Sequence, residues 1–347
     1  MVEIDPSSGS IDSEHTLSPW TVNVALIHKH PELHHYTSRG GLEGIWTTNT
    51  LWATHFSSLS DSSEVLLLTT PLLDAMQPPV RRYLIDKQRT SFSTRKMVKK
   101  QGGINNVTKG RVLDFIEAHM ETAFTGGNVS PLAEPFVCSF CSHANDNEYE
   151  KTNGLLSQWR GYGGHGRFAI VFDTQKLDSQ LAREWRAHFW VKLELAEVVY
   201  LEGPETLARA FPDLVEAAVA MISDMIDGSE NPRAKFIELF FQAATLLKHR
   251  GFREEREVRI VAIPQSREAL ADHGHEGRLI GRPPVKQVHE LGGSKKHVAL
   301  FDALHADLPI MRVIVGPGAN QKEDIEFARS VVSGRVPIAV SETPFIG

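Results

Sequence analysis

The chain of 347 residues has the composition of a globular protein, with 41% hydrophobic and 23% charged residues and a formal net charge of −6. This acidic balance gives no overall electrostatic reason to expect nucleic-acid binding, and no apolar run approaches the ~20 residues that a membrane helix needs. The first 18 residues are polar and lack the basic and apolar regions of a secretory signal, so we expect a disordered tail at 1–18. Only two cysteines occur, Cys138 and Cys141, which excludes a disulfide framework and favours a reducing, cytoplasmic setting.

The N-terminal third alternates short apolar stretches with turn-rich segments. The pattern predicts a strand at 33–37, a helix that opens at Gly40-Gly41, and a second strand at 51–54. Residues 71–85 have the spacing of a helix, and we expect a break in it at Pro78-Pro79 because proline removes a helical hydrogen bond.

The remaining elements mix helices and strands without strict alternation. The segment 168–172 is apolar at every position, so we expect a strand that is covered on both faces. This mixture favours a single α+β domain over 19–347, with insertions at about 71–130 and 266–296. The other expected elements are strands at 136–140, 258–263, 298–301, 310–315 and 336–340, and helices at 111–124, 204–226, 233–250 and 321–332.

A run of charges stands at the start of the apolar strand at 258–263. Alternation along a strand would place Glu255, Glu257 and Arg259 on one face. Two readings remain open for this face. It lines a cleft for a cationic ligand or intermediate, or it is a salt-bridged strand end.

Residues 81–100 carry the strongest local positive charge of the chain. A solvated helix face is the ordinary explanation of such a run, but this is also where a polyanionic substrate would dock. Tyr83 and Phe92 would add stacking to such a contact. The candidate substrate-binding residues are Arg81, Arg82, Lys96, Lys99 and Lys100.

Several other clusters are less specific. His34, His35 and His55, with Asp61 and Glu64, would suit a metal-dependent hydrolase, although surface histidines are the simpler interpretation.

Cys138 and Cys141 have a CxxC spacing with no second pair. A zinc site would need His143 or His165 as further ligands, so buried structural thiols are favoured. The glycines at 161–166 precede a strand rather than follow one, which excludes a dinucleotide-binding fingerprint.

The segment 157–162 combines Trp159, Arg160 and Tyr162 with an amide and glycines. Aromatic planes beside a guanidinium suit stacking on a flat ring and a grip on a pyrophosphate. A loop anchored under the core by its tryptophan is the alternative.

Five motifs in this order resemble a widespread bacterial family of unknown function found among defence and mobile genes. The resemblance covers about 30–320, and Ser60 stands where that family has Asn. The motifs are His35-Tyr36-Thr37, Leu51-Trp52-Ala53-Thr54-His55-Phe56 with Ser60-Asp61-x-x-Glu64, Ser157-Gln158-Trp159-Arg160-Gly161-Tyr162-Gly163, Phe252-x-x-Glu255-x-Glu257-Val258-Arg259, and Val315-Gly316-Pro317.

The same segments are more distantly similar to ADP-ribosyltransferases of the DarT and poly(ADP-ribose) polymerase type. That resemblance implies a split mixed β-sheet with helical insertions and NAD as the substrate, with no metal. It implies that His35 and Thr37 contact NAD, that Tyr36 or Trp159 stacks on a ring, and that Glu257 contacts the nicotinamide ribose. Glu255 would orient or deprotonate the acceptor, and Arg160 would hold the pyrophosphate.

The chemistry agrees with a carboxylate at that place. Cleavage of the nicotinamide bond develops an oxocarbenium ion, which a nearby carboxylate stabilises. We therefore expect an NAD-dependent ADP-ribosyltransferase or NAD glycohydrolase, acting as a toxin or defence effector on a nucleic-acid or protein acceptor. A metal-dependent nuclease or hydrolase and a non-catalytic sensor module are the alternatives.

Overall fold

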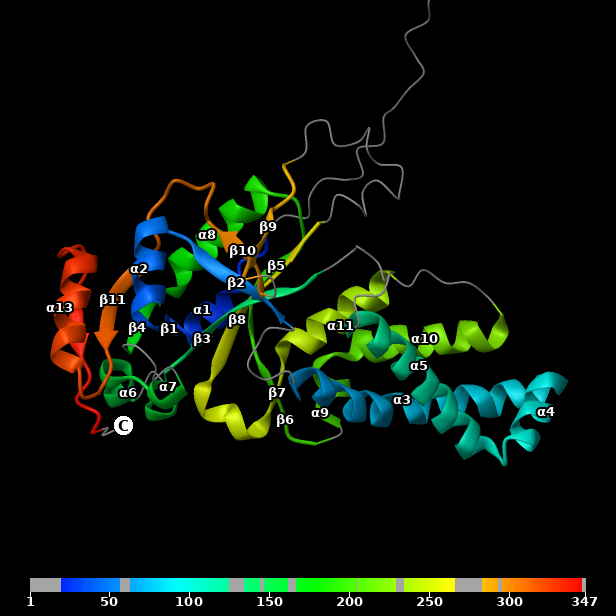
Figure 1. Ribbon diagram of the computed structural model, residues 1–347. Coiled ribbons are helices and arrows are strands. Elements are labelled where there is room, and N and C mark those ends of the chain that lie inside the picture. The colour runs from blue at the N-terminus through cyan, green and yellow to red at the C-terminus, as the bar shows by residue number, and fades with distance from the viewer. Residues whose placement is uncertain are drawn as a thin grey trace, which may run out of the picture.

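The computed structural model describes residues 20–56, 63–124, 134–143, 147–161, 167–203, 205–228, 234–265, 283–292 and 295–344. It is a mixed α/β structure built on an open mixed sheet (Figure 1). None of the helices in these ranges is long and apolar enough to cross a lipid bilayer. The expected tail at 1–18 and most of the expected 266–296 loop lie outside the described residues.

Within the described ranges ten strands form the main sheet, and β11 and β12 are its one parallel pair there. The main path is β12-β11-β4-β1-β3-β2-β10-β9, and β8 and then β5 extend from the other side of β3. Its strands are β1 (Glu32–Thr37), β2 (Leu51–His55), β3 (Phe136–Cys141), β4 (Phe168–Asp173), β5 (Trp190–Glu197), β8 (Glu257–Pro264), β9 (Val288–Leu291), β10 (Lys295–Leu300), β11 (Ile310–Val315) and β12 (Ile338–Val340).

The sheet splits along one edge of β3. Strand β8 pairs with β3 over its whole length, so β1 and β2 must share the opposite edge. On that edge β1 pairs only at Cys141, and β2 pairs only at Phe136 and Val137. The backbone of β3 between these positions therefore has neither strand beside it in the described ladders. The imidazole of His35 enters this split, where its Nδ1 lies 2.9 Å from the carbonyl oxygen of Ser139.

One face of the sheet packs against helices α2 (Arg39–Thr48), α8 (Thr174–Ala187) and α13 (Gln321–Val332), and we call it the α8 face. Leu33, Phe140, Ile170 and Ile260 point into this core with leucines from the helices. Helix α1 (Val24–Lys29) adds Leu26 to the same cluster. The burial of the alternate strand residues fixes which side chains of β1, β3, β4 and β8 point here.

The other face, which we call the α7–α11 face, is covered in two parts. Near β1 and β4 it packs against α6 (Glu148–Asn153) and α7 (Leu156–Gly161), with Trp159 fully buried beside Tyr36. Near β8 it packs against α11 (Ala234–Leu246) through Val137 and Val261. The small parallel sheet of β6 (Val199–Leu201) and β7 (Leu247–His249) and the 3₁₀ helix η2 (Arg250–Glu255) lie beside it.

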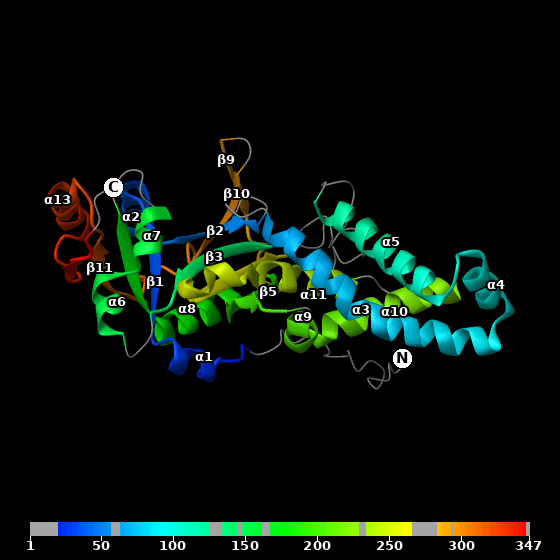
Figure 2. The same cartoon turned by 90° about the horizontal axis from the view of Figure 1, so that it is seen from below.

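A helical arm projects from this part of the sheet (Figures 1 and 2). It consists of α3 (Ser63–Thr90), α4 (Phe92–Lys100), α5 (Ile104–Phe124), α9 (Glu205–Ala210), α10 (Pro212–Asp227) and α11. Helix α3 buries a stripe at a spacing of four residues, Leu68, Leu72, Met76, Val80 and Leu84, against α5 and α10.

Two details of the arm and its surroundings differ from the sequence-based expectations. Helix α3 continues through Pro78 and Pro79, because the buried stripe on either side of them holds the helix in place. The helix expected at 233–250 ends at Leu246, and η2 follows, so Glu255 lies in a 3₁₀ turn rather than in the strand. The strand begins at Glu257, after Arg256 with a φ of +45°.

Candidate functional site

The register of the sheet sends His35 and Glu257 to opposite faces. His34 pairs with Cys141, which pairs with Glu257, so these three side chains point to the α7–α11 face. His35 is the next residue of β1 and points to the α8 face, where its ring lies 5.6 Å from that of Phe140. The expectation that His35 and Glu257 line one cleft is therefore contradicted by the structure.

Thr37 follows the same alternation and lies with His35 on the α8 face. A Cβ atom on Gly41 would lie 1.9 Å from the Thr37 hydroxyl oxygen, so the start of α2 rests directly on this side chain. Thr37 is buried by that contact. Its position is that of a packing residue beneath a helix, and it does not approach Glu257.

Strands β1, β3 and β8 instead bring His34, Cys141 and Glu257 into one row on the α7–α11 face. The backbones of His34 and Glu257 are two strand spacings apart, roughly 10 Å. Tyr36 shares this face one step along β1, opposite Ala169. The two distant motifs of the chain do meet across β3, but through the neighbours of the residues that the sequence indicated.

The negative charge of Glu257 is already balanced by neighbouring cations. Its side chain is 4% exposed, and its oxygens accept hydrogen bonds from Lys248 at 2.8 Å and from Arg259 at 2.7 and 3.2 Å. Burial alone would raise the pKa of this carboxyl, but the two cations outweigh it and hold the pKa at about 2. The carboxylate is thus ionised and fully engaged in a buried ion-pair cluster. This is the geometry of the salt-bridged strand end.

Glu255 reaches the same cluster from η2. One of its oxygens lies 2.8 Å from the Lys248 ammonium, which bridges the two glutamates. Burial raises the pKa of Glu255, whereas Lys248 acts to lower it. The two carboxylates therefore share one cation, and both are largely buried, with side chains 15% and 4% exposed.

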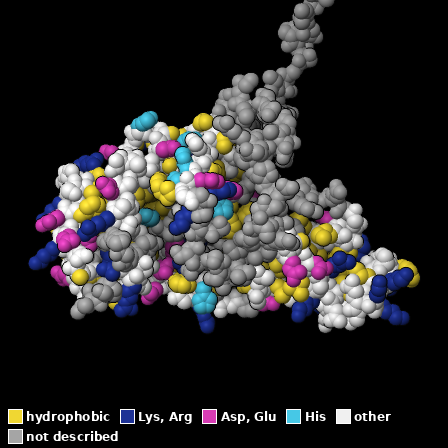
Figure 3. Space-filling model, in the orientation of Figure 1, with side chains coloured by type: hydrophobic (Ala, Val, Ile, Leu, Met, Phe, Trp, Pro, Cys, Tyr) yellow, Lys and Arg dark blue, Asp and Glu magenta, His cyan; other side chains and the backbone are white. Residues whose placement is uncertain are grey.

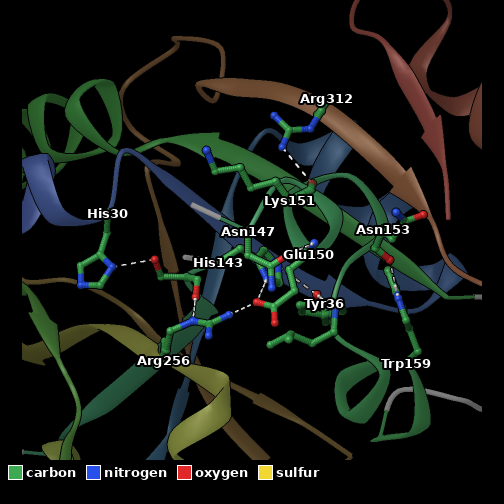
Figure 4. A network of polar contacts seen from close by, with 12 residues as sticks. His30, Tyr36, His143, Asn147, Glu150, Lys151, Asn153, Trp159, Arg256 and Arg312 are labelled. Carbon is green, nitrogen blue, oxygen red and sulfur yellow. Dashed lines mark hydrogen bonds and ion pairs between the residues drawn. The ribbon is translucent and has the colours of Figure 1, made fainter. Parts of the chain in front are cut away.

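A second polar network fixes the α6–α7 segment onto this face (Figure 4). The Tyr36 hydroxyl accepts a hydrogen bond from the Leu155 amide at 2.8 Å and lies 3.1 Å from His143 Nε2. Arg256 forms an ion pair with Glu150 and donates a 2.7 Å hydrogen bond to a backbone carbonyl. Tyr36 is therefore buried in a structural network instead of being free to stack on a ligand.

Trp159 is the anchor of this segment. Its ring is fully buried, and its Nε1 donates a 2.8 Å hydrogen bond to the carbonyl of Asn153. Glycines press on it, since a Cβ atom on Gly154 or Gly316 would lie 2.5 or 2.7 Å from ring atoms. The interpretation as a loop anchored by its tryptophan fits these contacts. Arg160 is exposed at the end of α7, and Tyr162 lies outside the described residues.

His34 is the residue that sequence reasoning underestimated. It is buried, its ring lies edge-on to His143 with 3.9 Å between centroids, and neither of its ring nitrogens makes a hydrogen bond of ordinary geometry. Burial, together with His143 and Arg312, keeps its pKa well below the usual value. Both histidines are thus neutral. Only the pairing of β1 with β3 distinguishes His34 from His35, and no sequence signal gives that pairing.

Of the residues proposed for a metal site, the two histidines lie apart. His35 lies against Phe140, and His55 lies against Phe136. Phe136 and Phe140 are four residues apart along β3, a distance of roughly 13 Å. The side chains of Asp61 and Glu64 lie outside the described residues. In the described ranges, one set of ligand atoms is close enough to share a cation, that of Glu184, His188 and Asp302. The ammonium of Lys286 already pairs with both carboxylates.

The two cysteines also do not form a common site. Cys138 points into the core of the α8 face, and Cys141 points to the opposite face beside Tyr36. Burial raises the pKa of Cys138 to about 12 and that of Cys141 well above its usual value, so both thiols stay protonated. Neither is suited to act as a nucleophile or a metal ligand in this state.

An exposed group of basic residues lies on the helical arm. Residues 81–111 contain ten Lys and Arg and one acidic residue, Asp86. Figure 3 shows Lys and Arg side chains at the far end of the arm, together with apolar ones. Seven of these cations are exposed and make no ion pair with the described residues: Arg81, Arg82, Arg95, Lys96, Lys99, Lys100 and Lys109. We call five of them the basic arm surface, namely Arg81, Arg82, Lys96, Lys99 and Lys100.

The local geometry concentrates this charge. Phe92, Lys96, Lys99 and Lys100 recur at helical spacing on one side of α4, and Phe92 is 74% exposed. A pocket of about 430 Å³ lies beside Arg81 and Arg82. The arm therefore offers cations beside an exposed aromatic ring on α4 and cations beside a concave surface on α3.

Comparison with known proteins adds no assignment. No protein-family model matches the sequence, and neither a curated protein nor a solved structure shows significant similarity to it. The function must therefore be argued from the chain's own geometry.

Proposed function

We propose that this chain binds nucleic acid through its helical arm. The observation that carries this proposal is the ten-to-one excess of cations over acids at residues 81–111 in a chain whose net charge is −6. Such an excess repels itself unless anionic groups approach it, and closely spaced phosphates supply them. The rest of the protein is net acidic, so the positive charge is concentrated on the arm.

The geometry of the arm supports a nucleic acid over an arbitrary acidic surface. The cations follow α3 and α4 over a length that a phosphate backbone can track. Phe92 offers an exposed ring among them, which would stack on a base. Arg81 is held by a 2.9 Å hydrogen bond to Asn105, which orients its guanidinium beside the pocket.

Binding of a labelled oligonucleotide, measured by fluorescence anisotropy, tests this proposal. In the arm variant all five residues of the basic arm surface are changed to Gln, which has a similar helix propensity. The control variant loses five exposed cations from α8 and α13 by the changes Lys176→Gln, Arg183→Gln, Arg186→Gln, Lys322→Gln and Arg329→Gln. We expect at least tenfold weaker binding for the arm variant only. Equal affinities for the two variants would overturn the proposal.

A second candidate function is ADP-ribosyl transfer from NAD, or NAD hydrolysis, with the bound nucleic acid as an acceptor. The split of the sheet beside β3 supports it, because an ADP-ribosyltransferase-like core implies such a split. The row of His34, Cys141 and Glu257 supports it further, since it joins the two motif segments. This chemistry requires the ion pair between Lys248 and Glu257 to break, and for that reason ADP-ribosyl transfer is the second candidate rather than the first. A toxin or defence role remains a prediction of the same hypothesis.

Release of nicotinamide from NAD, with and without nucleic acid, tests the second candidate. We expect release by the unaltered protein and its loss in Glu257→Gln, while the exposed neighbour gives an unaffected control, Glu254→Gln. Both variants are compared at a temperature where circular dichroism shows them folded. Absence of release under every condition, or equal release by both variants, would remove this candidate and leave nucleic-acid binding untouched.

A further inference from the structure

Three aromatic rings form a stack across strands β2, β10 and β9. Trp52 lies on His297 with 4.1 Å between ring centroids and 27° between planes, and His297 lies on His289 with 5.3 Å and 25°. We call these three residues the ring ladder. Their spacings are close to the distance of about 4.7–4.9 Å between neighbouring strands. Each of the three rings thus comes from a different, neighbouring strand.

The strand register explains why the rings line up. His297 is paired with His289 in β9 and with Thr54 in β2, and Trp52 is two residues before Thr54. All three side chains therefore point to the same face of the sheet. Burial, with a contribution from His289, lowers the pKa of His297, so the middle ring is a neutral, flat surface at neutral pH. The row is built from rings whose flat faces meet, as in a stack of bases.

One end of the ring ladder is open. His297 is 8% exposed, but Trp52 is 49% exposed, which is unusual for the largest apolar side chain. The next strand in the row is β3, and β2 pairs with it only at Thr54 and His55, beyond Trp52. At Trp52 itself no β3 residue is paired with β2, so the described ladders place no strand beside this end of the row. A fourth flat ring would fit against the free face of Trp52.

The face has the character of a contact surface for bases. Figure 3 shows histidine side chains gathered in the upper part of this view, over the region of β2 and β10. The arm begins shortly after β2 in the chain, at Ser63, so the ring ladder lies near its base. Arg81 is 18 residues along α3 from Ser63, or about 27 Å. A single strand that runs from the basic arm surface along α3 to the base of the arm would place bases at β2.

We propose that the ring ladder stacks an unpaired nucleobase of a single-stranded nucleic acid that is held by the arm. This inference rests on the proposed function and specifies the kind of nucleic acid. A duplex keeps its bases stacked on one another, so only a single strand or a flipped base offers a free ring face. Stacking on an aromatic side chain contributes between about 5-fold and 150-fold in affinity for each base.

The first experiment compares a single strand of about 15 nucleotides, within the common range of site sizes, with its duplex. We expect the unaltered protein to prefer the single strand, Trp52→Ala to weaken single-strand binding by at least 5-fold, and Trp52→Phe to keep most of it. Tyr149→Ala is the matched control, because Tyr149 is an exposed ring on α6, away from the ladder. Unchanged single-strand affinity in Trp52→Ala would overturn the inference.

A second experiment uses strands with abasic positions, which keep the phosphates and lack the rings. The unaltered protein should lose affinity when the stacked position is abasic, and Trp52→Ala should lose nothing further. Equal losses in both proteins would show that the base contacts another site and would overturn the inference. If the unaltered protein binds no nucleic acid at all, the proposed function itself fails. If binding depends on the basic arm surface but not on Trp52, only the inference about the ring ladder is overturned.

Discussion

Replacing Glu257 by Gln removes the charge at the centre of the buried ion-pair cluster while keeping the shape of the side chain. The pKa of this carboxyl is held at about 2 in the folded protein against an ordinary value of 4.5. That gap corresponds to about 3 kcal/mol of folding free energy at neutral pH. The loss of one partner from a buried ion pair commonly costs about 3–5 kcal/mol, which agrees. We expect Glu257→Gln to lower the free energy of unfolding by about 3 kcal/mol at pH 7.

The assay is urea unfolding followed by tryptophan fluorescence, with the slope of the transition checked for equality between variants. The folded-state pKa lies below the unfolded one, so the contribution of Glu257 is complete above about pH 4.5 and is lost as the pH falls toward 2. The difference between the unaltered protein and Glu257→Gln should narrow over that range. Glu254→Gln, at an exposed position, should change stability by less than about 0.5 kcal/mol. A loss below about 1 kcal/mol for Glu257→Gln would refute the assignment of this carboxylate to a structural cluster.

Two further substitutions and a labelling experiment test the packing around the sheet. Gly154→Ala should destabilise the protein by about 2 kcal/mol or more, the order of magnitude known for strained backbone sites. The φ of +74° and ψ of 179° at Gly154 suit glycine alone, and a Cβ there would meet a buried ring at 2.5 Å. Gly161→Ala, with open space around it, is the control in thermal unfolding. Tyr36→Phe should cost about 1–3 kcal/mol in the same measurement, because it leaves a buried amide without its 2.8 Å acceptor, and a loss near zero would speak against the network. Cys138 and Cys141 should react with a thiol reagent at pH 8 only after denaturant is added, and rapid labelling of the native protein would contradict their burial.

The sequence predicted the strands of the sheet better than it predicted the site. An apolar run such as 168–172 is a strand because both faces are buried, and that information is local. Which of His34 and His35 faces Glu257 depends on the pairing of β1 with β3, and one residue of register reverses every side chain. Local pattern carries no information on that pairing. The expectation taken from the motif resemblance therefore placed the His35 imidazole on the same face as Glu257, whereas it lies on the opposite face.

Lys248 was missed for a related reason. It is nine residues before Glu257 in a segment with helical periodicity, and nothing in that pattern indicates that the helix stops at Leu246 and turns the lysine toward the strand. The basic arm surface, in contrast, was visible from composition alone. The excess of positive charge in this segment is a property of composition, so it does not depend on strand register.

The salt dependence of oligonucleotide binding tests the central claim most directly. If the five cations of the basic arm surface each neutralise one phosphate of a single strand, the logarithm of the binding constant should fall with the logarithm of salt concentration with a slope of about −3.5. That slope predicts a loss of about 100-fold in affinity between 50 and 200 mM salt, and the arm variant with all five changed to Gln should show a clearly shallower slope. A steep slope that persists unchanged in the arm variant, or no binding at low salt, would contradict the account.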